Sequence, residues 1–122
     1  MSNISVHDLG IDNKTEADGL AVGRPSKFAT AISEHLISGI YTLEDEKVYG
    51  LLTKLLDTEN IFLEPFATAG LIGLQRIAVT NYAQENKLNM ENATHIAWAT
   101  GGDLVPEDQR NAFYKRGLHL IE

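Results

Sequence analysis

Two places in the sequence combine residue types that could bind a small molecule. At the first, Thr100, Gly101 and Gly102 follow an apolar stretch, residues 94–99, that we expect to form a strand. Ligands of open α/β sheets bind beyond the carboxyl ends of the strands, where a hydroxyl offers a hydrogen bond and glycines let a ligand approach the backbone. The same residues also suit a simple turn between a strand and a helix, which is the more frequent use of such glycines.

The second place is Glu64, which follows a short apolar run at residues 61–63 and precedes Pro65. A carboxylate there could cap the N-terminus of a helix, where the helix dipole favours negative charge. Capping is the more frequent role of a residue at such a position. The carboxylate could equally face a ligand, so both roles stay open on these residues alone.

Residue types and spacing exclude several other kinds of site. The chain has no cysteine, which rules out disulfides, zinc sites built on cysteine and a cysteine nucleophile. The four histidines have neither H-x-x-x-H nor H-E-x-x-H spacing, and no G-x-S-x-G motif is present, so we expect no metal site and no hydrolase triad. The glycines within residues 18–24 do not have the spacing of a phosphate-binding loop.

Composition indicates an acidic globular chain of one domain or less. The 122 residues include 17 Asp and Glu against 10 Lys and Arg, which gives a formal net charge of −7, and 43% are hydrophobic. Nucleic-acid binding needs a basic surface, so we expect no nucleic-acid partner. No apolar run approaches the roughly 20 residues of a membrane span, and the first residues do not form a secretory signal. We therefore expect no membrane association and a cytoplasmic location.

The elements that must position the candidate residues follow from hydrophobic periodicity and capping patterns. About four helices are predicted, at residues 25–39, 42–56, 66–82 and 106–117. The second begins with a T-x-x-D capping box and continues with an i, i+3, i+4 apolar pattern. The third is rich in Ala and Gly and apolar nearly all round, so we expect it to be buried and closely packed.

A few short strands complete the predicted α/β fold. The apolar runs at residues 61–63 and 94–99 are the strand candidates, and the second does not alternate, which suits a strand covered on both faces. Trp98 is then expected in the core. We expect a single partial domain, with an extended segment at 1–24, an α/β core at 25–117 and a tail at 118–122.

Three segments taken together resemble the bacterial D-serine dehydratases, also called D-serine ammonia-lyases. They are residues 6–24, residues 63–65 with their Ala- and Gly-rich continuation, and residues 92–107. The first and third together separate this family from the L-serine and L-threonine dehydratases. The resemblance extends from about residue 4 to residue 117 and matches the C-terminal part of a much longer enzyme. It implies the tryptophan-synthase-β-like fold of the fold type II pyridoxal-phosphate enzymes.

The resemblance also implies roles for the candidate residues. Thr100 matches the residue whose hydroxyl hydrogen-bonds to the pyridine nitrogen of pyridoxal phosphate, Gly101 and Gly102 would keep the backbone close to the ring, and Glu64 would lie near the ring. The intact enzyme would convert D-serine to pyruvate and ammonia by β-elimination. The lysine that holds the cofactor and the phosphate loop lie upstream of the matched region. The resemblance therefore gives this chain no catalytic residue, and we expect it to be inactive without the N-terminal part of the enzyme.

Two other functions stay open. The chain could be a stand-alone interaction or oligomerisation module derived from that fold, in which case an exposed apolar surface would bind a partner or a second copy. Self-association is also expected of a bare fragment. Alternatively, it could be a fragment of an L-serine or L-threonine dehydratase relative with the same cofactor. Asp103 and Phe66 stand where the family has smaller residues, so the edge of the pocket is expected to differ.

Overall fold

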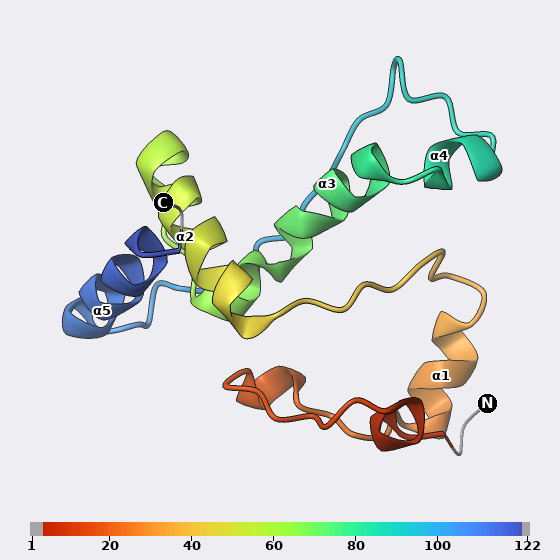
Figure 1. The fold of residues 1–122 in the computed structure, drawn as a ribbon, viewed down its shortest axis with the longest axis horizontal. Coiled ribbons are helices and arrows are strands. Elements are labelled where there is room, and N and C mark those ends of the chain that lie inside the picture. The colour runs from red at the N-terminus through yellow and green to blue at the C-terminus, as the bar shows by residue number, and fades with distance from the viewer. Residues whose placement is uncertain (1–3, 121–122) are drawn as a thin grey trace. The chain divides into compact units, whose positions relative to one another are not determined.

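The structure, a computed structural model, describes residues 4–120, and within them helices are joined by irregular segments (Figure 1). The helices are η1 (Val6–Leu9), η2 (Asp18–Leu20), α1 (Lys27–Ser33), α2 (Asp45–Glu59), η3 (Pro65–Leu71), α3 (Ile72–Val79), α4 (Tyr82–Glu85) and α5 (Glu107–Leu118), where η denotes a 3-10 helix. None of these helices has the length and apolar character that crossing a membrane requires. The first three residues of the expected opening segment and the last two of the expected tail lie outside the described residues.

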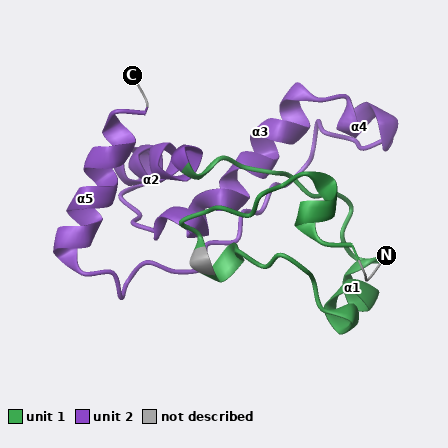
Figure 2. Cartoon of the chain, turned by 60° about the horizontal axis from the view of Figure 1, so that its bottom comes forward, with its two compact units in different colours: residues 1–45 green, residues 46–122 purple. Residues whose placement is uncertain are grey.

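The chain forms two compact units, residues 1–45 and residues 46–122, shown in different colours in Figure 2. The boundary falls at the beginning of α2. All four candidate binding residues therefore belong to the second unit.

The first unit contains η1, η2 and α1. The segment expected to be extended at residues 1–24 includes the two single-turn helices η1 and η2. In α1 the Ser26 side chain caps the helix by accepting a hydrogen bond from the Ala29 amide at 3.0 Å. The helix ends at Ser33 and not at Gly39. Its apolar residue Phe28 is 77% exposed, so packing does not stabilise a longer helix there.

Helix α2 confirms the predicted second helix. It begins at Asp45, the last residue of the expected capping box, and not directly after Thr42. The Asp45 carboxylate accepts hydrogen bonds from the Thr15 hydroxyl at 2.8 Å and from the Glu16 amide at 2.7 Å. These donors come from a loop 29 and 30 residues away in sequence. The spacing T-x-x-D could not reveal that use of the aspartate.

The core of the second unit is formed where α2 packs against η3 and α5. Leu52 and Val48 of α2 are 0% and 2% exposed. The buried Thr68 hydroxyl of η3 lies 3.1 Å from the Val48 carbonyl and 2.6 Å from the Pro65 carbonyl, so its one proton is shared between two acceptors. Buried polar groups are tolerated when they are bonded in this way.

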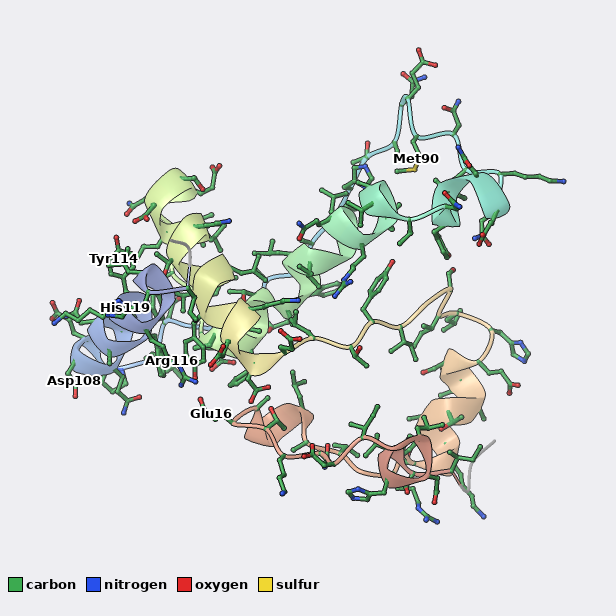
Figure 3. The ribbon with its side chains drawn as sticks, in the orientation of Figure 1. Glu16, Met90, Asp108, Tyr114, Arg116 and His119 are labelled. Carbon is green, nitrogen blue, oxygen red and sulfur yellow. The ribbon has the colours of Figure 1, made fainter. Side chains whose placement is uncertain are left out.

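Helices α2 and α5 lie side by side in Figures 1 and 2, and they approach each other closely at Gly117. A methyl group at Gly117 would overlap the Thr53 hydroxyl and the Tyr49 carbonyl of α2. The Thr53 hydroxyl also donates to the Tyr114 carbonyl at 3.2 Å. Figure 3 shows Tyr114 and Arg116 on α5, and the Arg116 guanidinium lies 4.0 Å from the centre of the Tyr49 ring. The end predicted for the last helix is thus confirmed to within a residue.

The third predicted helix, residues 66–82, is wrong in two respects. The structure divides it into η3, α3 and α4, with a break between Val79 and Tyr82. Only the η3 part is packed: it contains buried residues, whereas α3 and α4 contain none. Glycine is also not required for close packing at Gly70, because a methyl group there would lie an ordinary 3.9 Å from the Trp98 backbone.

The expected strands are also wrong, and within residues 4–120 the fold is helical without a strand. Residues 61–63 and 94–99 are irregular, and residues 91–100 are exposed along their whole length. Trp98, expected in the core, is 83% exposed. A strand forms only when a neighbouring strand pairs with its backbone, and no such neighbour lies among the described residues. The α/β expectation therefore fails for this chain taken by itself.

Candidate functional site

An open cleft of about 810 Å³ lies in the second unit, and all four candidate binding residues line it. Its walls are residues 61–64, residues 99–106 and Gln109. The structure therefore brings Glu64 to the same surface as Thr100, Gly101 and Gly102, although a long helical stretch separates them in sequence.

The two walls are joined through their backbones. The Glu64 amide donates a hydrogen bond to the Gly101 carbonyl at 3.0 Å. A methyl group at Gly102 would lie 2.9 Å from the Leu63 Cα and 2.9 Å from the Phe62 carbonyl oxygen. The φ angle of Gly102 is also +151°, which residues with a side chain rarely adopt. Close approach and backbone conformation therefore both require glycine at this position.

Glu64 occupies the position that a helix cap would occupy but does not act as one. It directly precedes η3, which begins with Pro65, and its side chain makes no capping hydrogen bond. Its carboxylate lies against the neighbouring wall, since a methyl group at Gly101 would be 3.2 Å from Glu64 Oε1. The carboxylate is thus available at the cleft surface.

The polar groups of the cleft define what it can bind. Thr100 is exposed and contributes a hydroxyl, Glu64 and Asp103 contribute carboxylates, and Gln109 contributes a carboxamide. None of the described residues that line the cleft is Lys, Arg or His. The cleft can therefore hydrogen-bond to a neutral or basic edge of a ligand, but it offers no cationic side chain for a phosphate.

Sequence reasoning missed Arg110, which supports the cleft from behind. Its Nε donates to the Val105 carbonyl at 2.8 Å, and its Nη2 donates to the carbonyls of Gly102 at 3.1 Å and Asp103 at 2.7 Å. The guanidinium carbon also lies 4.7 Å from the centre of the Phe62 ring. The signal that could have found it is an arginine in the first turn of a helix that follows a glycine-containing loop, where backbone carbonyls lack helical partners.

A second open cavity, of about 640 Å³, lies beside the cleft and shares Phe62 and Val105 with it. Arg110 and Tyr114 also line this cavity. The Tyr114 hydroxyl donates to Asp57 Oδ1 at 2.8 Å, and this hydrogen bond raises the pKa of Tyr114. Among residues 4–120 there is no group of three or more His, Cys, Asp and Glu side chains placed to hold a metal ion.

Comparisons with known proteins identify relatives that match almost the whole chain. No family model matches it. The probable D-serine dehydratase of Bacillus mycoides (strain KBAB4) is 53% identical over 121 residues, and that of Geobacillus stearothermophilus is 50% identical over 123 residues. The probable D-serine dehydratase of Bacillus cereus (strain AH187) is 53% identical over 120 residues.

Each of these three comparisons covers 96% of this chain and 27% of the relative. The chain therefore spans about a quarter of the length of the relatives that it matches. The motif resemblance predicted such a match, and the prediction is confirmed. The chain is homologous to a segment of proteins named probable D-serine dehydratase, consistent with a C-terminal fragment of that enzyme.

Proposed function

We propose that this chain forms one wall of the cofactor pocket in a pyridoxal-phosphate-dependent D-serine ammonia-lyase. The observation that carries the proposal is the cleft in which Glu64 meets Thr100, Gly101 and Gly102. It is supported by relatives that are named probable D-serine dehydratase. The proposed substrate of the intact protein is D-serine, and the proposed location is the cytoplasm.

The polar groups of the cleft fit one edge of pyridoxal phosphate. The exposed Thr100 hydroxyl is suited to donate a hydrogen bond to the ring nitrogen, and the two glycines let the wall that carries Glu64 lie close beside it. The cleft has no basic side chain for the phosphate and no lysine for the aldehyde. The rest of the polypeptide would supply the groups for both of these ends.

The reaction that follows is the elimination of the β-hydroxyl and the α-proton of D-serine. Water leaves in this step and is regained on hydrolysis, so that D-serine gives pyruvate and ammonia. Bound pyridoxal phosphate supplies an electron sink for removal of the α-proton. A neutral hydroxyl at Thr100 orients the ring nitrogen without enforcing its protonation, as a carboxylate would. That milder sink suits an elimination, in which the leaving hydroxyl carries the electrons away.

The apolar surface beside the cleft supports the idea of a missing partner. Leu104 is 97% exposed, Ile96 is 87% exposed and Trp98 is 83% exposed. Large exposed apolar side chains in adjoining segments mark a surface that another chain or segment covers. The N-terminal part of the enzyme is the proposed cover. The same surface favours a second candidate function, in which the chain is a stand-alone module that binds a partner or a second copy of itself.

The test replaces the matched segment of the Geobacillus stearothermophilus protein with this chain. We expect the hybrid to bind pyridoxal phosphate, seen as visible absorption, and to release pyruvate from D-serine in preference to L-serine and L-threonine. Thr100→Val should weaken cofactor binding by about tenfold, the effect of losing one hydrogen bond, and Thr100→Ser should restore it.

Three results would contradict the proposal. A folded hybrid that binds no cofactor would overturn the pocket assignment, and preferential turnover of an L-amino acid would overturn the substrate. Pyruvate release by the 122-residue chain alone would overturn its proposed inactivity. The interaction module is favoured instead if the isolated chain forms a defined dimer in solution and the hybrid binds no cofactor.

A further inference from the structure

We propose that Arg110 is a positioning residue that holds the two walls of the cleft in register and so fixes the backbone that carries Thr100. The inference rests on the proposed function, because it assigns a supporting residue to the same site. Arg110 does not line the cleft itself. It acts on the cleft through the residues that it contacts.

The contacts of Arg110 gather three backbone carbonyls of one wall. The Gly102, Asp103 and Val105 carbonyls all accept hydrogen bonds from its guanidinium. Two of these bonds use the same nitrogen, Nη2, so the Gly102 and Asp103 carbonyls converge on one point. Carbonyl oxygens that converge in this way repel one another unless a donor, best a charged one, lies between them.

The opposite wall bonds to this one at Gly101, and the turn that follows is supported more weakly. Residues 101–106 form an irregular turn in which the Val105 amide donates to the Gly102 carbonyl at a rather long 3.2 Å. An irregular turn of this kind keeps one conformation when contacts from its surroundings hold it. The three hydrogen bonds from Arg110 are contacts of that kind.

Arg110 contacts the opposite wall as well. The guanidinium lies over the ring of Phe62, two residues before Glu64, with 4.7 Å between the guanidinium carbon and the ring centre. A guanidinium can stack on a ring and donate in its own plane at the same time, which a lysine ammonium cannot do. Arg110 thus links the wall that carries Glu64 to the wall that carries the glycines.

The experiment uses the hybrid enzyme with Arg110→Lys, which keeps the charge, and Arg110→Met, which keeps an apolar side chain over Phe62. The exposed Lys115 of the same helix provides the control, Lys115→Ala. The affinity for pyridoxal phosphate is measured by titration of the cofactor-free protein, together with the fluorescence emission of the bound cofactor. We expect both Arg110 variants to bind the cofactor about tenfold more weakly with shifted emission, and the control to stay within about twofold of the parent.

The outcomes separate this inference from the function on which it rests. If the parent hybrid folds but binds no cofactor, the proposed function and this inference fail together. If the parent binds and both Arg110 variants match it in affinity and emission, only this inference fails. It also fails if Arg110→Lys matches the parent in affinity and emission while Arg110→Met does not, because a positive charge without the planar guanidinium would then be enough.

A second measurement applies if an Arg110 variant of the hybrid does not fold. Amide hydrogen exchange at Val105 is compared between the 122-residue chain and its Arg110→Lys variant. We expect faster exchange in the variant, because the carbonyl that binds this amide would no longer be fixed. An unchanged exchange rate at Val105 would overturn the inference.

Discussion

The two units of the chain are stabilised by different kinds of contact. The first unit contains hydrogen bonds at exposed and half-buried side chains, such as the 2.7 Å bond from the Ser5 amide to the Asp8 carboxylate. In the second unit, α2 buries Leu52 completely and approaches α5 closely at Gly117. Burial contributes more to stability than exposed polar contacts do. The second unit is therefore the part expected to hold its geometry.

This difference explains where the candidate site lies. Both walls of the cleft adjoin packed helices, because η3 follows Glu64 directly and α5 begins next to Pro106. A binding surface needs such rigid neighbours if its polar groups are to stay in place. The first unit, whose helix α1 exposes Phe28, offers no comparable support.

The largest expected effect comes from comparing one apolar side chain in each unit. Leu52→Ala removes a side chain that is 0% exposed, and we expect a loss of about 2–5 kcal/mol in the free energy of unfolding. Phe28→Ala removes a larger side chain that is 77% exposed, and the change should stay within about 0.5 kcal/mol. Urea denaturation followed by circular dichroism measures both. Equal effects would show that the two units do not differ in packing.

A second comparison uses the two neighbouring glycines of the cleft. Gly102→Ala places a methyl group against backbone atoms at 2.9 Å and a φ of +151°, so we expect a loss of about 1–3 kcal/mol from backbone strain alone. Gly101→Ala meets the movable end of the Glu64 side chain at 3.2 Å, and its cost should stay below about 0.5 kcal/mol. Thermal unfolding of the two variants measures the difference. A larger loss for Gly101→Ala would mean that the walls are not joined as described.

The helices that the sequence predicts correctly are those whose stabilising contacts lie within this chain. The apolar spacing of α2 reflects its packing in the second unit, and position 117 in the last turn of α5 is a glycine because α2 lies against it. The structure also brings the candidate binding residues together, since the Glu64 amide bonds to the Gly101 carbonyl. Local pattern and local packing agree in these places, which is why the prediction succeeds.

The strand prediction fails because it depends on neighbours that residues 4–120 do not include. Residues 94–99 are apolar enough for a buried strand, but a strand needs a partner strand, and Trp98 is left exposed without one. Arg110 was missed for a different reason, because an arginine in the first turn of a helix is a weak signal that does not specify that the carbonyls of Gly102 and Asp103, eight and seven residues away, converge on it. Its role follows from the turn of the backbone, which the residue types do not specify.

The smallest expected effect is a difference in pH dependence between the two units. The pKa of Asp8 is lowered, first by the hydrogen bond from the Ser5 amide and then by that from the Ser5 hydroxyl. A lowered pKa means that this contact stabilises the folded state above about pH 4 and is lost as the pH falls. The pKa of Tyr114 is raised by its hydrogen bond to Asp57, so that contact stabilises the folded state below about pH 10 and is lost as the pH rises. We therefore expect acid to weaken the Ser5–Asp8 contact of the first unit and alkali to weaken the Tyr114–Asp57 contact of the second.

Titrations of individual groups test both directions. The Asp8 carboxyl is followed by NMR, and Ser5→Ala should bring its pKa only part of the way back to the ordinary value, because the stronger bond comes from the Ser5 amide, which remains. Asp57→Asn should lower the pKa of Tyr114, measured by NMR of its ring, because the carboxylate that accepts the hydrogen bond from the phenol is replaced by a neutral amide. The Asp8 titration should be unchanged in Asp57→Asn, since the two contacts belong to different units. If the pKa values of both Asp8 and Tyr114 shift in either variant, the two units affect each other's titration, and the contrast between them does not hold.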